Sequence, residues 1–332
     1  MIDIIIATCN RFQRALYLAT SLLDASGLIN NVILVDSSEK VSNIQAINSS
    51  IILISTEHQN QPYQRYLGYQ ASKSECLLFL DDDMELLDVN VFEDIKKIFS
   101  DKEVVAINLL FENNNTFLAA QPVGMVSNTS PLKRILGILT GYPIAKPNHY
   151  IHNGIRGKRV PADYIEYLSG GAFAVRSNVL YQDFNMQLFS IYEEKLGKGE
   201  DGMIGYTLSK HGKIFSYANK CFVHNDFKDS SYSNDQKVFT LKVMYSRLFL
   251  SCEYYRLNRK PFALGYFRFW HYAIGRIMGG FVNYLSEPTV LRLDVLKGNL
   301  IAFKCSFKFQ YDSKQRLNNY WEKEAKKDLK QE

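Results

Sequence analysis

Three consecutive carboxylates, Asp81-Asp82-Asp83, directly follow the apolar run 77–80. Four large apolar residues between polar neighbours predict a strand that is buried on both faces of a sheet. Ligands bind at the carboxyl ends of such strands in open α/β sheets, so the triplet is placed for chemistry. Crowded carboxylates need compensation, and Mg²⁺ or Mn²⁺ prefers their oxygens. A solvated turn explains the same residues, and the triplet alone leaves both interpretations open.

A second acidic pair, Glu200-Asp201, stands between glycines at the start of a short helix expected over 203–211. Acids at a helix start cap free N–H groups and complement the helix dipole. A carboxylate on such a glycine-flanked loop can also accept the proton of a substrate hydroxyl. His224, after a strand expected over 213–223, is either a structural histidine or a ligand for Mn²⁺.

The elements that position these residues alternate between strand and helix. Strands are expected at 2–7, 31–36, 51–54, 77–81 and 104–110, and helices at 11–26, 62–73 and 89–99. Such alternation predicts an α/β fold with a mostly parallel sheet flanked by helices. The irregular stretch 111–167 is expected to cover the substrate. A strand over 167–175 contains Gly170-Gly171, where a ligand or another backbone can approach closely.

Composition places the chain among ordinary globular proteins. It has 332 residues, 46% hydrophobic and 22% charged, and a net charge of +5, which does not call for a nucleic-acid partner. Five widely spaced cysteines without a CxxC pair indicate reduced thiols and no disulfide framework. The first residues lack the basic region and cleavage site of a secretory signal. We therefore expect a cytoplasmic protein.

Six motifs follow one another along residues 1–225. They are Thr8-Cys9-Asn10-Arg11, the strand-ending Asp36, Arg65-Tyr66-Leu67-Gly68, Leu80-Asp81-Asp82-Asp83, Gly170-Gly171-Ala172-Phe173 and Gly199-Glu200-Asp201. Their order and approximate spacing resemble those of glycosyltransferase family 2, whose DxD and ED signatures correspond to the fourth and sixth. Two positions depart from the family pattern on the nucleoside side: Tyr66 replaces an Asn, and Ser37-Ser38 lacks a Gly.

The resemblance implies a GT-A fold with a nucleotide-sugar-binding half, 1–110, and an acceptor-binding half, 111–225. It implies that the donor lies against Thr8, Asn10, Arg11, Asp36, Arg65, Asp81 and Asp82. Asp83, with Asp81 and His224, would hold Mn²⁺ or Mg²⁺ at the diphosphate. Asp201 would be the general base, Glu200 would help to position the acceptor, and Gly170 and Gly171 would lie on the acceptor side.

The region 226–332 is expected to be helical, with helices over 238–257 and 261–285. The second helix is rich in apolar residues but contains Arg268 and Arg276, which argue against a membrane-spanning segment. One interpretation is an interfacial helix on an anionic membrane, at the inner face of the membrane. Packing against the catalytic domain, or self-association into a homo-oligomer, explains the same pattern. Residues 323–330 read as a charged, solvated helix end.

These features predict a metal-dependent, inverting transferase that moves one sugar from a nucleotide donor to a hydroxyl of a glycan or lipid-linked acceptor. The Gln-x-x-Arg-Trp motif of processive synthases is absent, because neither Trp270 nor Trp321 follows an arginine. A nucleotidyltransferase is one alternative, but it usually has a Gly-rich phosphate loop where this chain has residues 8–11. A catalytically silent module that binds nucleotide sugars or membranes is the other alternative.

Overall fold

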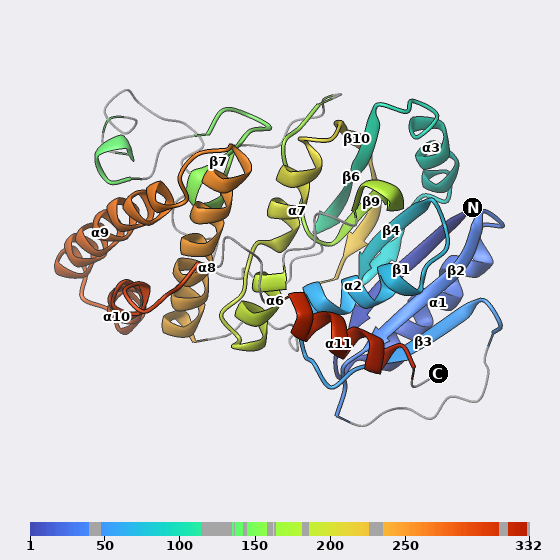
Figure 1. Cartoon of the computed structure of the whole chain (residues 1–332), viewed down its shortest axis with the longest axis horizontal. Coiled ribbons are helices and arrows are strands. Elements are labelled where there is room, and N and C mark those ends of the chain that lie inside the picture. Colours follow the sequence, from blue (N-terminus) through green and yellow to red (C-terminus); the bar gives the residue numbers. More distant parts are fainter. Residues whose placement is uncertain are drawn as a thin grey trace.

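The computed structural model describes residues 1–39, 48–113, 135, 137–141, 145–157, 162, 164–180, 186–225, 235–311 and 318–330. Among these residues, eight strands form one sheet in the order β3-β2-β1-β4-β9-β6-β10-β5 (Figure 1). The strands are β1 (Ile2–Thr8), β2 (Ile29–Asp36), β3 (Ile51–Ser55), β4 (Cys76–Asp81), β5 (Met84–Leu86), β6 (Val104–Asn113), β9 (Ala172–Arg176) and β10 (Lys213–His224). The expected α/β class with a mostly parallel sheet is confirmed, since only β9 and β5 run antiparallel to their neighbours.

The register of the central strands brings their polar ends to one edge. β1 runs parallel to β2 and β4, with Thr8 opposite Asp36 and Ala7 opposite Asp81. Along β4, Leu78 and Leu80 join the core on one face of the sheet, whereas 77 and 79 join the core on the other. β4 is therefore buried on both faces, as its apolar run predicts, and the acidic triplet emerges where the buried strand stops.

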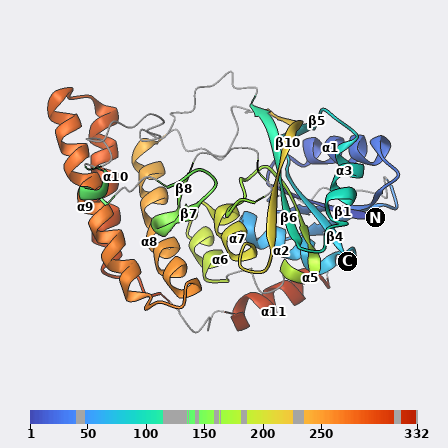
Figure 2. The same cartoon turned by 90° about the horizontal axis from the view of Figure 1, so that it is seen from above.

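Helices cover both faces of the sheet (Figure 2). On one face lie α1 (Phe12–Ala25) and α3 (Val91–Ile98). On the other lie α2 (Gln61–Ala71), α5 (Ser177–Leu180), α6 (Met186–Glu193), α7 (Glu200–Leu208) and α11 (Asn318–Asp328). The start of α2 follows from its sequence: the Asn60 side chain accepts a hydrogen bond from the Tyr63 N–H, and Pro62 suits the first turn.

Three further helices form a layer at the end of the molecule away from β1–β3 (Figures 1 and 2). They are α8 (Gln236–Leu257), α9 (Ala263–Ser286) and α10 (Val290–Ser306). They share a core with α6, α7 and the hairpin of β7 (Tyr150–Ile151), the short 3-10 helix η1 (His152–Gly154) and β8 (Ile155–Arg156). None of the described helices combines the length and the apolar run that crossing a bilayer requires.

Several elements differ from the sequence-based expectations. β5, α6 and α10 were not expected, and the strand predicted from residue 167 begins only at Ala172. The 323–330 tail is not simply solvated. Its lysines are exposed, but Ala325 and Asp328 are buried because this face of α11 packs on the nucleotide half. This segment is too short for its periodicity alone to distinguish a helix packed on the protein from a solvated helix.

Candidate active site

The first part of the site links the ends of β1 and β4. Thr8 Oγ1 donates a hydrogen bond of 2.7 Å to Asp82 Oδ2, and Arg11 Nη2 lies 2.5 Å from Asp82 Oδ1. Burial raises the pKa of Asp82 to about 6, although the Arg11 charge and the Thr8 hydroxyl oppose the shift. Thr8, Arg11 and Asp82, which the sequence analysis grouped on the donor side, therefore lie together.

A second cluster joins the turns after β1 and β2. Asp36 Oδ1 accepts hydrogen bonds from the Ser38 N–H at 3.0 Å and from Ser38 Oγ at 2.5 Å. Ser38 Oγ in turn accepts a 2.7 Å bond from the Asn10 N–H. Asn10 has a φ of 57°, a conformation that asparagine tolerates better than most residues. Ser38, which departs from the family pattern, thus connects by hydrogen bonds the two turns expected around the nucleoside.

Asp83 and His224 form the pair most suited to a divalent ion. Asp83 Oδ1 lies 3.3 Å from His224 Nε2, close to the spacing of about 3 Å between adjacent ligands of one octahedral ion. Burial would raise the pKa of Asp83, but His224 and Arg11 outweigh it and the pKa is lowered. An ionised carboxylate beside an imidazole is a donor set that accepts Mn²⁺.

Asp81, the third predicted metal ligand, is held differently. Its Oδ1 accepts hydrogen bonds from Arg65 Nη2 at 2.8 Å and from Gln61 Nε2 at 2.9 Å. Among the residues that the structure describes, no three His, Cys, Asp or Glu side chains gather as a ready metal cluster. Asp83 and His224 therefore fit a divalent ion as a pair, and further ligands would have to come from a bound ligand or from a rearranged Asp81.

Arg65 connects the donor-side and acceptor-side carboxylates. Its buried guanidinium donates from Nη2 to Asp81 and from Nη1 to Glu200 Oε1 at 2.9 Å, and lies over the Phe173 ring. Burial would lower the pKa of Arg65, but the two carboxylates raise it, so the guanidinium keeps its positive charge. One side chain thereby ties the acidic triplet to the Glu200-Asp201 motif, 119 positions further along the chain when counted from Asp81 to Glu200.

Asp201 is clamped by an arginine that the sequence analysis did not identify. Arg156 Nη1 donates to Asp201 Oδ2 at 3.1 Å, and Arg156 Nη2 donates to Oδ1 at 3.0 Å. The Gly170 N–H donates a short hydrogen bond to Oδ2. A bidentate pair of this kind fixes the carboxylate plane as well as its charge.

The pKa values of the two neighbouring acids, Glu200 and Asp201, are shifted in opposite directions. Burial would raise the pKa of Asp201, but Arg156 and then Arg65 outweigh it, so the pKa is lowered. Burial and the adjacent Asp201 raise the pKa of Glu200 despite Arg65, and the Tyr192 hydroxyl donates a short hydrogen bond to Glu200 Oε2. Such divergence is how acid and base roles are separated in paired carboxylates. The interpretation as a simple helix cap is incomplete, because both side chains bind groups outside their own helix.

The glycine pair lies between the two acidic motifs. Gly170 donates to Asp201, and the Gly171 carbonyl accepts a 2.9 Å bond from the Asp81 N–H. Gly171 has a φ of 100°, and a Cβ there would lie 2.3 Å from Met84 Cε. The sequence therefore needs glycine at 171 both for the backbone conformation and for the close packing.

Three partner residues were missed for different reasons. Arg156 lies in the irregular stretch 111–167, where no periodicity fixes position, and its basic charge was the only available signal. Tyr192 belongs to α6, which was not expected, and Gln61 precedes the helix that was expected over 62–73. Of the region expected to cover the substrate, residues 114–134, 136, 142–144, 158–161 and 163 lie outside the described residues.

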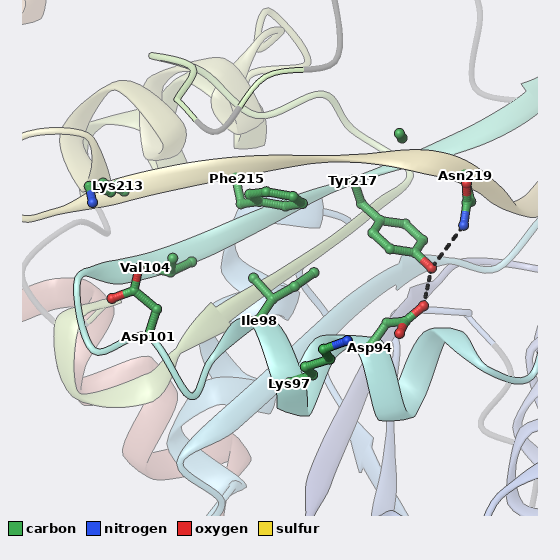
Figure 3. A pocket seen from close by; sticks show the side chains of 10 residues that line it. Asp94, Lys97, Ile98, Asp101, Val104, Lys213, Phe215, Tyr217 and Asn219 are labelled. Carbon is green, nitrogen blue, oxygen red and sulfur yellow. Dashed lines mark hydrogen bonds between the residues drawn. The ribbon is translucent and has the colours of Figure 1, made fainter.

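A separate hollow of about 580 Å³ lies between α3 and β10 (Figure 3). Its lining includes Phe215 and Lys213 of β10 and Lys97 of α3, and Tyr217 donates a short hydrogen bond to Asp94. None of the predicted site residues lines it. This hollow is therefore distinct from the carboxylate cluster.

Comparison with known proteins identifies one family. The model for glycosyl transferase family 2 matches residues 3–180, more than half of the chain. TarS of S. aureus (residues 1–349) is similar in structure at 13% identity and a TM-score of 0.49, over 98% of this chain and 88% of that chain. A mannosyltransferase from Pyrobaculum calidifontis, solved with GDP-Man and Mn²⁺, is similar at 12% identity and a TM-score of 0.46, over 97% and 87%. No curated protein sequence matches the chain.

Proposed function

The chain belongs to glycosyltransferase family 2 and has the GT-A fold, and on this premise we propose that it transfers a single sugar, with inversion, from a nucleotide diphosphate donor to a hydroxyl. The hydroxyl belongs to a glycan or to a lipid-linked acceptor. The observation that carries the proposal is the Arg65 bridge between Asp81 and Glu200. It joins the motif expected at the leaving group to the motif expected at the attacking hydroxyl.

On the donor side, Thr8, Asn10, Arg11, Asp36, Asp81 and Asp82 bind the nucleotide sugar. Asp83 and His224 would hold Mn²⁺ or Mg²⁺. When bound, the ion supplies positive charge at the diphosphate, where negative charge develops as the bond to the anomeric carbon breaks. Arg65 is a positioning residue here, because its two carboxylate bonds fix Asp81 relative to the acceptor half.

On the acceptor side, Asp201 takes the proton from the attacking hydroxyl. A general base must be ionised at working pH, and the lowered pKa of Asp201 meets that requirement. Oδ2 accepts from both Arg156 and Gly170, whereas Oδ1 accepts from Arg156 alone, so Oδ1 is the oxygen assigned to the proton. Glu200 keeps the start of α7 in place through Arg65 and Tyr192. A single in-line attack then inverts the anomeric centre.

The alternatives fit less well. A nucleotidyltransferase usually has a Gly-rich phosphate loop after its first strand, whereas residues 8–11 of this chain contain no glycine. A silent binding module has no need of a buried base whose pKa is separated from that of its neighbour. We therefore assign an active transferase.

The first test is calorimetric titration of the full chain with UDP, GDP, CDP and dTDP, each with and without Mn²⁺. We expect one diphosphate to bind, to require the metal, and to lose at least about tenfold in affinity in Asp83→Ala and His224→Ala. Glu93→Ala, an exposed carboxylate on α3, is the matched control and should bind normally. Failure of every diphosphate to bind the folded protein would refute the donor assignment.

The second test addresses the base. With the donor nucleotide identified, Asp201→Asn should lower the release of nucleoside diphosphate in the presence of acceptor by at least about a hundredfold. Nucleotide affinity measured by the same titration should stay within about twofold, because Asp201 lies on the acceptor side. Full turnover in this variant would show that Asp201 is not the base.

A further inference from the structure

An apolar surface covers the outer side of α9 and α10. On α9 the exposed apolar side chains lie at spacings of three, four and seven residues, which place them on one side of the helix, and Phe267 and Met278 are each 63% exposed. The set, here called the outer face, comprises Leu264, Phe267, Ile274, Met278, Phe281, Val282, Leu285, Val290, Leu291, Leu300, Ile301 and Phe307. Exposed apolar patches of this extent mark interaction sites.

A segment far away in sequence extends this face. Ile138 and Leu139 are exposed, and the Leu139 carbonyl lies 2.8 Å from His271 Nε2 on α9. A Cβ at Gly275 would lie 2.0 Å from the Thr140 carbonyl oxygen, so the two backbones are in direct contact. The outer face is thus assembled from two parts of the chain.

The charge around the outer face is almost entirely positive. Residues 259–311 contain eight Lys and Arg but only two acids, so their net charge of +6 exceeds the net charge of the whole chain, which is +5. Lys297 and Lys304 are exposed among the apolar residues of α10, Lys308 is exposed just after this helix, and Glu287 is paired with Arg292. Long lysine side chains next to apolar ones suit a boundary between headgroups and acyl chains.

This charge distribution decides between the two occupants that the sequence left open. A second copy in a symmetric contact would bring the lysines of the two faces together, with Asp294 as the single acidic residue of α10 to pair with them. An anionic bilayer supplies both an apolar phase and negative headgroups. We propose that the outer face of α9 and α10 lies on an anionic phospholipid surface, without crossing it.

The helices that carry the outer face are linked to the acceptor side of the site. Arg247 of α8 donates a 2.5 Å bond to the Asn153 carbonyl in η1, and the Asn153 side chain donates to the Arg268 carbonyl of α9. The same hairpin continues to Arg156, which clamps Asp201. The helices on the lipid surface therefore also support the acceptor side of the site, although the lipid contact itself does not depend on the proposed reaction.

The test is co-sedimentation of the full chain with vesicles of phosphatidylcholine alone and of an equal mixture of phosphatidylcholine and phosphatidylglycerol. We expect binding to the anionic vesicles only, weakened by salt. Combining Lys297→Gln, Lys304→Gln and Lys308→Gln should weaken binding by at least about tenfold. The control combines Lys96→Gln, Lys97→Gln and Lys102→Gln, which remove three exposed lysines on and after α3, and should bind like the unmodified chain.

The apolar part of the face is tested with Phe267→Gln combined with Phe281→Gln. The control is Tyr17→Gln combined with Leu87→Gln, two side chains that are at least half exposed and lie on the catalytic half. The first pair should lose vesicle binding at least about tenfold, and the second should not. All variants replace exposed side chains, and melting curves establish that each is folded. The proposal is overturned if the unmodified chain binds neither vesicle. It is also overturned if light scattering shows a dimer that only the Phe267 and Phe281 changes dissociate.

Discussion

At the scale of single residues, the site depends on which side chains lie next to each carboxylate. Glu200 and Asp201 are adjacent in the chain, yet Glu200 faces Arg65 and Tyr192 while Asp201 faces Arg156. Both are buried, so the difference in their pKa values comes from these partners rather than from solvent exposure. A base and a positioning residue can therefore share one helical turn.

Arg156→Gln should move the pH profile of the transfer reaction. Without the guanidinium the pKa of Asp201 rises, by about one to three units for a lost ion pair. Because only the ionised base is active, the acidic limb of kcat/KM shifts to higher pH, and activity at low pH falls most. Lys195→Gln, an exposed cation before α7, should leave the limb in place. A uniform loss of rate at every pH would indicate that Arg156 has only a structural role.

The sequence predicted the acids of this site better than their partners. Asp81, Asp82 and Asp83 follow a buried strand, and Glu200 and Asp201 start a helix, so local pattern places them. Arg156 reaches Asp201 from 45 positions away in an irregular stretch. No local rule gives that distance, because it depends on how the β7–β8 hairpin packs on α8.

At the scale of elements, α7 is the helix that positions the acceptor-side acids. All nine of its residues are buried, although its sequence has little amphipathic character. A Cβ at Gly205 would lie 2.1 Å from the Leu168 N atom. The helix therefore sits directly on the backbone that leads to Gly170, and the glycine sets how closely it approaches.

Gly205→Ala should displace α7 and lower transfer by about a hundredfold, as a shift of about 1 Å in a catalytic group can do. It should also lower the melting temperature. Gly279→Ala is the matched control, because no atom lies within 4 Å of a Cβ at that position in α9. The control should stabilise the chain by about 0.5 to 1 kcal/mol. Equal activity of the two variants would contradict the packing argument.

The helix α11 differs from the solvated end expected from its charges. Trp321 is buried against Tyr63 and Phe189, and its Nε1 donates to Ser190 Oγ. Asp328 accepts hydrogen bonds from Thr56 and Tyr63. The prediction of a solvated end rested on the four exposed lysines. The packing of α11 depends instead on the face that carries Trp321, which a count of charges does not detect.

Trp321→Ala should reduce the free energy of unfolding by about 3 to 5 kcal/mol, because a large buried ring is removed. Tyr320→Ala changes the neighbouring aromatic, which is 52% exposed, and should cost no more than about 0.5 kcal/mol. Denaturant unfolding followed by far-UV circular dichroism measures both. Similar losses in the two variants would mean that α11 is not docked through Trp321.

At the scale of the whole molecule, the described part of the chain is held together by three apolar cores. Two lie on the faces of the sheet, and the third is formed by α8–α10 with residues of α6, α7 and the β7–β8 hairpin. The sequence predicted the sheet and the existence of C-terminal helices, since alternation and long apolar runs are local signals. It did not predict the third core, because Met203 and Tyr206 join one core with Leu248 only after folding.

The third core makes the expected boundary at 225 a poor place to cut the chain. A protein of residues 1–225 would expose the side of α7 that packs on α8, and it would also lose α11. We expect this fragment to show no cooperative melting transition and no nucleotide binding. A chain of residues 1–311, which loses α11 but keeps α8–α10, should still melt cooperatively at a lower temperature. If residues 1–225 melted cooperatively and bound nucleotide like the full chain, the helical layer would be an accessory domain and the acceptor side of the site would not depend on it.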